Sequence, residues 1–234
     1  MLQYYHILPV RASLFQSLEI RGKCVVLDKQ AKAAIPVITV ILAVLNILAF
    51  AVTEYHGSSL DSSHMIHMGA MYEPSIIEHQ EYYRLISCMF LHFGMEHLMN
   101  NMISLLVLGY SLEHAIGKVW FGLIYLGAGF ISSIVSFLYN MQTGQEMVSC
   151  GASGAVFGLM GALMVLLVVY RRRNLRGEIP RFALYLALSL YTGFQDPGID
   201  GAAHAGGFIS GMLICVIMCV IKRFYKDRKG QREE

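Results

Sequence analysis

Charged residues are scarce in this sequence: Asp, Glu, Lys and Arg make up 15% of its 234 residues, whereas 56% are hydrophobic. Soluble globular domains carry about 25% charged residues, so the composition argues against an ordinary soluble protein. Several stretches approach the roughly 20 apolar residues that a helix needs to cross the hydrocarbon core of a bilayer. The sequence therefore predicts an all-α, polytopic membrane protein with a single membrane domain.

Metal-binding and disulfide patterns are also missing. The five cysteines have neither the spacing of metal ligands nor that of a disulfide framework. The histidines and glutamates between residues 56 and 81 lack the helical arrangement of a zinc metalloprotease. The basic clusters come without a nucleic-acid recognition module. We therefore expect no metal, no cofactor and no nucleic-acid partner. A disulfide between Cys88 and Cys150, which fall near the same predicted membrane face, stays open as an alternative.

Six apolar segments are predicted to cross the membrane. The fifth is short, with about 13 apolar residues, but basic residues precede it and acidic residues follow it, which supports a crossing. Together the segments form a membrane domain over residues 35–221, between an N-terminal segment (1–34) and a basic C-terminal tail (222–234). The segments cover about 35–52, 92–113, 119–139, 152–170, 181–194 and 202–221.

Positive charge is distributed unevenly between the two sides of this predicted bundle. With six crossings, both termini and the connections 2–3 and 4–5 share one side, which holds every Lys and Arg except Arg84. Because Lys and Arg are retained on the cytoplasmic side, both termini are predicted to be cytoplasmic. We expect a multi-pass protein of the cell membrane. The bacterial inner membrane is favoured because no targeting presequence or large soluble domain is recognisable.

A serine and a histidine each stand at the start of an apolar segment. Ser153 lies in Gly-Ala-Ser-Gly and His204 in Ala-His-Ala-Gly-Gly. Polar groups are costly inside hydrocarbon and are usually there for function. A serine hydroxyl becomes a useful nucleophile when a base such as histidine takes its proton. No Asp or Glu lies deep in a predicted span, so a Ser–His dyad is predicted rather than a triad.

Small residues follow both of these positions at helical spacing. Gly154 and Gly158 are four residues apart on one segment, as are Ala203, Gly207 and Gly211 on the other. Small residues at this spacing let two helix backbones approach closely in a membrane. Such an approach is what a hydrogen bond between the serine and the histidine requires.

Other residues are placed to support the reaction. His97 and Asn101 are one helical turn apart and, with the backbone N–H of Ser153, are candidate donors to an oxyanion. Phe157, one turn after Ser153, is predicted to pack under the histidine ring. Asp200 is predicted to cap the last span, with orientation of His204 as the alternative.

The order and spacing of these motifs resemble the rhomboid family of intramembrane serine proteases. The resemblance covers residues 84–211 and implies a six-helix bundle that cleaves transmembrane or membrane-proximal segments of other proteins. The expected partners are therefore membrane-protein substrates and the lipid bilayer. The motifs are His97-Leu-Met-Asn-Asn101, Gly109 to Glu113, Gly151-Ala-Ser-Gly-Ala-Val-Phe-Gly158 and Ala203-His-Ala-Gly-Gly207.

The resemblance also implies roles for single residues. Arg84 is implied to brace the long first loop and Glu113 the turn between spans two and three. The short fifth span is similar to a lateral gate for substrate helices. Two residues depart from the family pattern, Tyr83 in place of tryptophan and Phe157 in place of tyrosine. The implied site comprises Ser153 as nucleophile, His204 as general base, His97 and Asn101 at the oxyanion, and Gly151, Gly154 and Phe157 in support.

Two other classes of protein remain as alternatives. A non-catalytic protein that binds client helices on the same scaffold is disfavoured because both Ser153 and His204 are present. A small transporter is disfavoured because the two halves of the chain show no convincing internal repeat.

Overall fold

The computed structural model describes residues 35–144, 146–169 and 198–230. All of the regular secondary-structure elements within these residues are helices. The predicted N-terminal segment, the predicted fifth span and the arginine run before it lie outside these residues, as do the last four residues of the tail. Within the described ranges no strand occurs beyond one isolated bridge between Met71 and Ser149. The elements are α1 (Val37–His56), α2 (Ser62–His67), α3 (Glu73–His79), α4 (Arg84–Ser87), the 3-10 helix η3 (Cys88–Phe90), α5 (Gly94–Ile116), α6 (Lys118–Thr143), α7 (Ser153–Val169) and α9 (Gly201–Gly230).

Three helices of the described chain are long and apolar enough to cross a membrane: α1, α6 and α9 over Gly201–Phe224. They coincide with predicted spans one, three and six. α7 is apolar but has only 17 residues, and α5 carries polar residues along its length, so neither meets the same test. α9 continues as a helix to Gly230, beyond the predicted end of span six at residue 221.

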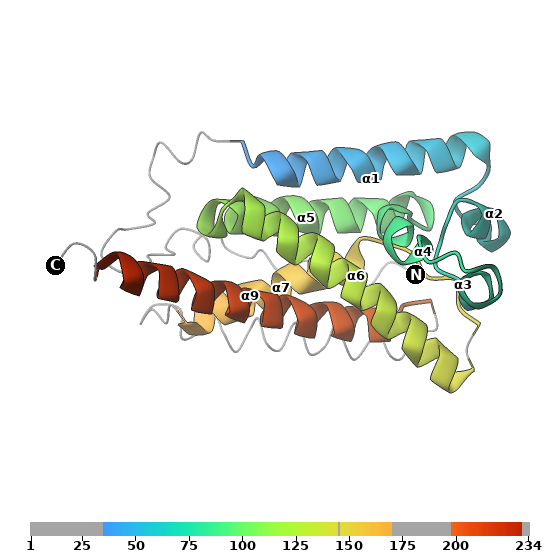
Figure 1. Cartoon of the computed structure of the whole chain (residues 1–234). Helices are drawn as coiled ribbons and strands as arrows, with labels where there is room; N and C mark the ends of the chain where they lie inside the picture. Colours follow the sequence, from blue (N-terminus) through green and yellow to red (C-terminus); the bar gives the residue numbers. More distant parts are fainter. Residues whose placement is uncertain (1–34, 145, 170–197, 231–234) are drawn as a thin grey trace, which may run out of the picture.

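The helix α7 forms the centre of the bundle. It packs most extensively against α9, and α6 packs against both of them, whereas α1 lies at the edge beside α5 (Figure 1). Leu159, Leu163 and Leu167 of α7 are almost completely buried. A helix that is apolar on all sides is suited to an interior position. Most side chains of α7 accordingly pack against neighbouring helices of the protein.

Glycines let α7 and α9 approach backbone to backbone. A Cβ atom added at Gly207 would overlap the carbonyl oxygen of Gly154, and one added at Gly211 would overlap that of Gly158. A Cβ at Gly161 would in turn overlap the carbonyl oxygen of Phe208. The close approach predicted from the spacing of small residues is therefore present, and it leaves no room for a side chain.

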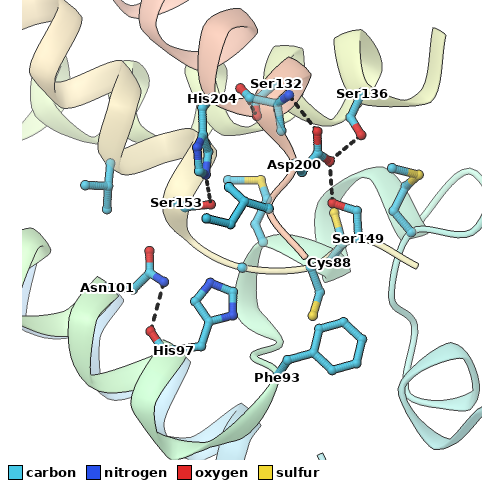
Figure 2. A pocket seen from close by; sticks show the side chains of 18 of the residues that line it. Cys88, Phe93, His97, Asn101, Ser132, Ser136, Ser149, Ser153, Asp200 and His204 are labelled. Carbon is cyan, nitrogen blue, oxygen red and sulfur yellow. Dashed lines mark hydrogen bonds between the residues drawn. The ribbon is translucent and has the colours of Figure 1, made fainter. Parts of the chain in front are cut away.

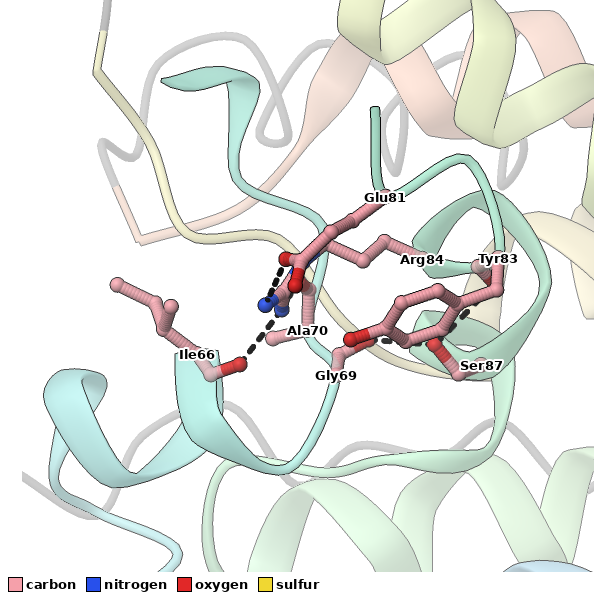
Figure 3. A network of polar contacts seen from close by, with 7 residues as sticks. All are labelled: Ile66, Gly69, Ala70, Glu81, Tyr83, Arg84 and Ser87. Carbon is pink, nitrogen blue, oxygen red and sulfur yellow. Dashed lines mark hydrogen bonds and ion pairs between the residues drawn. The ribbon is translucent and has the colours of Figure 1, made fainter. Parts of the chain in front are cut away.

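The first loop is folded around Arg84, the residue that the resemblance implies to brace it. Its guanidinium donates to the carbonyl oxygens of Ile66 at 2.5 Å and Ala70 at 2.9 Å, and to Glu81 Oε2 at 2.7 Å (Figure 3). The ring of Tyr83 lies 5.5 Å from the guanidinium carbon. Arg84 thus joins α2 to α4, because a buried arginine satisfies several carbonyl groups at once.

Glu113 braces the start of α1 rather than the turn between α5 and α6, so that prediction is wrong. Its carboxylate accepts hydrogen bonds from Ile38 N at 3.0 Å, Thr39 N at 2.8 Å and Thr39 Oγ1 at 2.8 Å. The first N–H groups of a helix have no partner within the helix. The Glu113 side chain of α5 therefore supplies hydrogen-bond acceptors for the first backbone N–H groups of α1.

A second contact ties the first loop to α6. Asn140 Nδ2 donates to Glu73 Oε1 at 2.7 Å, and both side chains are buried. Burial raises the pKa of the Glu73 carboxyl above its usual value, and the Asn140 hydrogen bond opposes that shift in part. This contact fixes α3 against the end of α6, close to the segment that precedes Ser153.

We expect Gly207→Ala to lower the free energy of unfolding by about 1–3 kcal/mol, because the new methyl group has to push α7 and α9 apart. The measurement is unfolding of the purified protein in mixed micelles with rising SDS. Gly122→Ala is the matched control, since a Cβ there meets only Ile38 Cγ2 at 3.8 Å. Equal stabilities of the two variants would contradict the role given to the glycine contact.

Candidate active site

Ser153 and His204 form a hydrogen-bonded pair. His204 Nε2 lies 2.9 Å from Ser153 Oγ (Figure 2). Ser153 is the first residue of α7 and His204 lies in the first turn of α9, so the glycine contact between these helices sets the distance. For Nε2 to accept the serine proton, Nδ1 has to carry the ring N–H. Nδ1 is buried and has no hydrogen-bond partner within the described chain, so the contact joins two side chains among these residues.

Phe157 stacks on the histidine. The ring centroids of Phe157 and His204 lie 4.3 Å apart with an interplanar angle of 12°. Phe157 is one turn after Ser153 on α7, so the same helix presents both the hydroxyl and the stacking ring. The contact restricts the orientation of the imidazole, whose Nδ1 no carboxylate of the described residues holds.

Gly151 lies between the side chains of His97 and Ser153. A Cβ added at Gly151 would lie 2.8 Å from His97 Cε1, 2.9 Å from His97 Nε2 and 3.6 Å from Ser153 Oγ. Gly151 has φ +139°, a conformation that disfavours side chains. The bare glycine therefore leaves a space between the imidazole of α5 and the serine hydroxyl.

Asn101 lies one turn after His97 and is engaged within its own helix. Its Nδ2 donates to the carbonyl oxygen of His97 at 3.0 Å. An amide carries two N–H donors, so this bond uses one of them. Both Asn101 and His97 line the same cavity as Ser153.

The segment before α7, residues 146–152, is named here the Ser153 loop. Ser149 exchanges two backbone hydrogen bonds of 2.9 Å with Met71 of the first loop. Gly151 N donates to the carbonyl oxygen of Cys88 at 2.9 Å, and Ala152 N donates to His92 Nε2 at 3.3 Å. The first loop and the segment before α5 thus fix the backbone of the Ser153 loop.

Asp200 caps α9, as the sequence predicts. Its Oδ1 accepts a hydrogen bond from Ala203 N at 2.8 Å, and its carbonyl oxygen accepts one from His204 N at 3.1 Å. The alternative, in which Asp200 holds the histidine ring, is not realised, because Nδ1 of His204 has no partner.

One face of α6 carries polar side chains that bond to residues around the site. These side chains were not among the site residues predicted from the sequence. Ser132 Oγ donates to the carbonyl oxygen of Ala203 at 2.8 Å, next to His204. Ser136 lies one turn further and donates to Asp200. The serines and Asn140 recur every four residues in an apolar helix, which is a sequence signal for one polar face.

The cavity around these groups has a volume of about 850 Å³, within the usual range of ligand pockets of about 300–1,000 Å³. All four cysteines of the described chain are free, so the bridge between Cys88 and Cys150 that the sequence leaves open is not formed. Among the described residues no group of three or more His, Cys, Asp and Glu side chains is arranged to hold a metal ion.

A model of the Rhomboid domain matches residues 79–221. This chain belongs to the rhomboid family. Together with its long apolar helices, this makes it a multi-pass membrane protein. The chain is 35% identical over 176 residues to the Rhomboid protease GluP of Bacillus subtilis, covering 75% of this chain and 34% of that protein.

Plant and fungal proteins are also similar. RHOMBOID-like protein 5 of Arabidopsis thaliana is 40% identical over 155 residues, which cover 64% of this chain and 48% of the relative. Rhomboid-type serine protease 2 of Emericella nidulans is 35% identical over 145 residues, or 61% of this chain and 27% of the relative. The matched regions thus cover about a quarter to a half of the length of these relatives.

We expect Gly151→Ala to slow the reaction of Ser153 with a fluorophosphonate probe by about tenfold or more, because the methyl group displaces either His97 or the Ser153 loop. The rate of covalent labelling in detergent micelles measures this. Gly144→Ala is the matched control: Gly144 also has a positive φ, +67°, but faces open space. Unchanged labelling of the Gly151 variant would argue against a tight contact with His97.

Proposed function

We propose that this protein is an intramembrane serine endopeptidase that cleaves transmembrane or membrane-proximal segments of other membrane proteins. The observation that carries the proposal is the 2.9 Å contact between Ser153 Oγ and His204 Nε2 within a cavity of the helix bundle. A serine paired with a base is suited to acyl transfer, and the rhomboid family match supports this reaction in a membrane.

In the proposed reaction, Ser153 Oγ attacks the carbonyl carbon of the scissile peptide bond while His204 Nε2 takes the hydroxyl proton. The tetrahedral intermediate then collapses, the C–N bond breaks, and His204 returns the proton to the leaving amine. A water molecule hydrolyses the resulting ester by the same proton transfers in reverse roles. The net reaction is hydrolysis of one peptide bond and needs no cofactor.

The negative charge that develops on the carbonyl oxygen requires hydrogen-bond donors. We assign this role to His97, the free N–H of the Asn101 amide and the backbone N–H of Ser153, with Gly151 and Gly154 keeping the space open. His97 adjoins Gly151, and all of these residues line the cavity. Donors already in place cost little reorganisation as the charge forms.

Phe157 takes over part of the task that a carboxylate has in a triad. Its stacking contact restricts the plane of the imidazole, so Nε2 keeps facing the serine while a proton is transferred. A dyad with a fixed ring is therefore a sufficient proton-transfer device, because orientation is one of the main functions of the third residue in a triad.

We further propose six spans with both termini in the cytoplasm, which the one-sided distribution of Lys and Arg supports. In this topology α5 and α7 are spans two and four, and the predicted fifth span, residues 181–194, lies outside the described residues. The bacterial inner (plasma) membrane is the location we propose; similarity to a Bacillus subtilis protein supports a bacterial source. Substrates are membrane proteins whose helices unwind readily near the cleaved bond.

The test is reconstitution of the wild-type protein, Ser153→Ala and His204→Ala in liposomes with a labelled single-span reporter. We expect cleavage by the wild type alone, because either substitution removes the activated nucleophile. The products are resolved by gel electrophoresis and mass spectrometry. Cleavage by all three proteins would point to a contaminant. Binding of the reporter without cleavage by any of them would favour a helix-binding scaffold.

We expect Asn101→Ala to lower kcat by about 10²–10³-fold with a smaller change in KM, because an oxyanion donor acts mainly in the transition state. Reporter cleavage in liposomes gives both constants. Gln142→Ala is the control, since Gln142 is an exposed amide of α6 that does not line the cavity. A near-normal kcat for the Asn101 variant would remove this residue from the oxyanion site.

A further inference from the structure

The carboxylate of Asp200 joins three separate parts of the molecule. Its Oδ1 accepts the hydrogen bond from Ala203 N in the first turn of α9 at 2.8 Å. Its Oδ2 accepts hydrogen bonds from Ser149 Oγ of the Ser153 loop at 2.6 Å and from Ser136 Oγ of α6 (Figure 2). Capping α9 requires one acceptor, so the two bonds to Oδ2 need another explanation.

Ser149 is the residue through which this carboxylate acts on the Ser153 loop. It lies two residues before Gly151 and four before Ser153. Its backbone is already paired with Met71 of the first loop, so only its hydroxyl reaches toward α9. The hydroxyl therefore links the loop that leads to the serine with the helix that carries His204.

The charge of Asp200 strengthens this link. Hydrogen bonds from neutral hydroxyls to a carboxylate are shorter and stronger than those between neutral groups, and a carboxylate at the N-terminus of α9 interacts favourably with the helix dipole. Of the contacts that the structure gives the Ser153 loop, those to Met71, Cys88 and His92 lead to the first loop and the segment before α5. The Ser149 hydroxyl bond leads to α9.

We propose that Asp200 is a positioning residue: through Ser149 it holds the Ser153 loop against the start of α9 and so maintains the distance between Ser153 and His204. The inference rests on the proposed function and names a further residue of the same site. Asp200 touches neither His204 Nδ1 nor Ser153 in the structure, so it acts on their geometry and not on the reacting atoms.

Ser149→Ala tests the link without altering the helix cap. We expect kcat for reporter cleavage in liposomes to fall by about tenfold or more while KM changes little, because substrate binding does not depend on the serine–histidine distance. Ser149→Thr keeps a hydroxyl and is expected to restore kcat. Ser210→Ala removes a buried hydroxyl that bonds only within α9 and is expected to resemble the wild type.

A double-mutant cycle with Asp200→Asn shows whether the two residues act together. The asparagine keeps one oxygen for Ala203 N, loses the charge and replaces the Oδ2 acceptor with an N–H donor, so the Ser149 hydroxyl has to accept instead of donate and the link is weaker. We expect the loss of kcat in the Asp200→Asn, Ser149→Ala pair to be smaller than the sum of the two single losses, since both substitutions act on the same link. Wild-type kcat for Ser149→Ala, equal losses for Ser149→Ala and Ser149→Thr, or additive effects in the cycle would each overturn the inference.

Failure of the proposed function gives a different result. A wild-type protein that cleaves no reporter would contradict the protease proposal by itself. The rate at which a fluorophosphonate labels Ser153 would then still decide the inference, because labelling requires the Ser153–His204 contact but no peptide substrate. A slower rate in Ser149→Ala, restored in Ser149→Thr, supports the link, and equal rates in all three proteins overturn it.

Discussion

The contact between the backbones of α7 and α9 is the constraint on which the site depends. The helices are so close that a methyl group added at Gly207 or Gly211 would overlap the carbonyl oxygen of Gly154 or Gly158. Ser153 and His204 begin the same two helices, and their side chains meet at 2.9 Å. In a membrane, close packing replaces the hydrophobic effect as the force between helices. The packing that stabilises the bundle therefore also sets the geometry of the proposed dyad.

Buried polar side chains make the remaining connections, and most of them serve backbone groups. Arg84 satisfies carbonyl groups at the end of α2, Glu113 satisfies N–H groups at the start of α1, and Ser132 donates to Ala203 O. An unpaired backbone group is costly where water is absent, so each contact stabilises the joint between two elements. Nδ1 of His204 is one of six buried side-chain atoms without a hydrogen-bond partner among the described residues, and the proposed role of this histidine would account for the cost of leaving it unsatisfied.

The sequence predicts the local features well and the contacts between distant residues less well. The helices α1, α6 and α9 follow from apolar length, and the small faces of α7 and α9 follow from glycine spacing, because both signals are periodic within one segment. The partner of Glu113 is α1, 74 residues away from it in sequence, and no periodicity encodes such a pairing. For the first loop, the resemblance implies Arg84 as the brace, but its partners were not predicted, because they are the carbonyl groups of Ile66 and Ala70 and every residue has such a group.

The polar face of α6 explains how the bundle keeps such long-range contacts in register. Ser132, Ser136 and Asn140 recur at one-turn intervals and bond in turn to Ala203 O, Asp200 and Glu73. Successive positions on this face are about 6 Å apart along the helix axis, so α6 fixes the heights of α9, of its cap and of the first loop relative to one another. In the Ser153 loop, the hydroxyl of Ser149 bonds to Asp200, which caps α9, and the backbone of Ser149 pairs with Met71 of the first loop. The depth of the Ser153 loop in the bundle is therefore determined by a helix that contributes no reacting group.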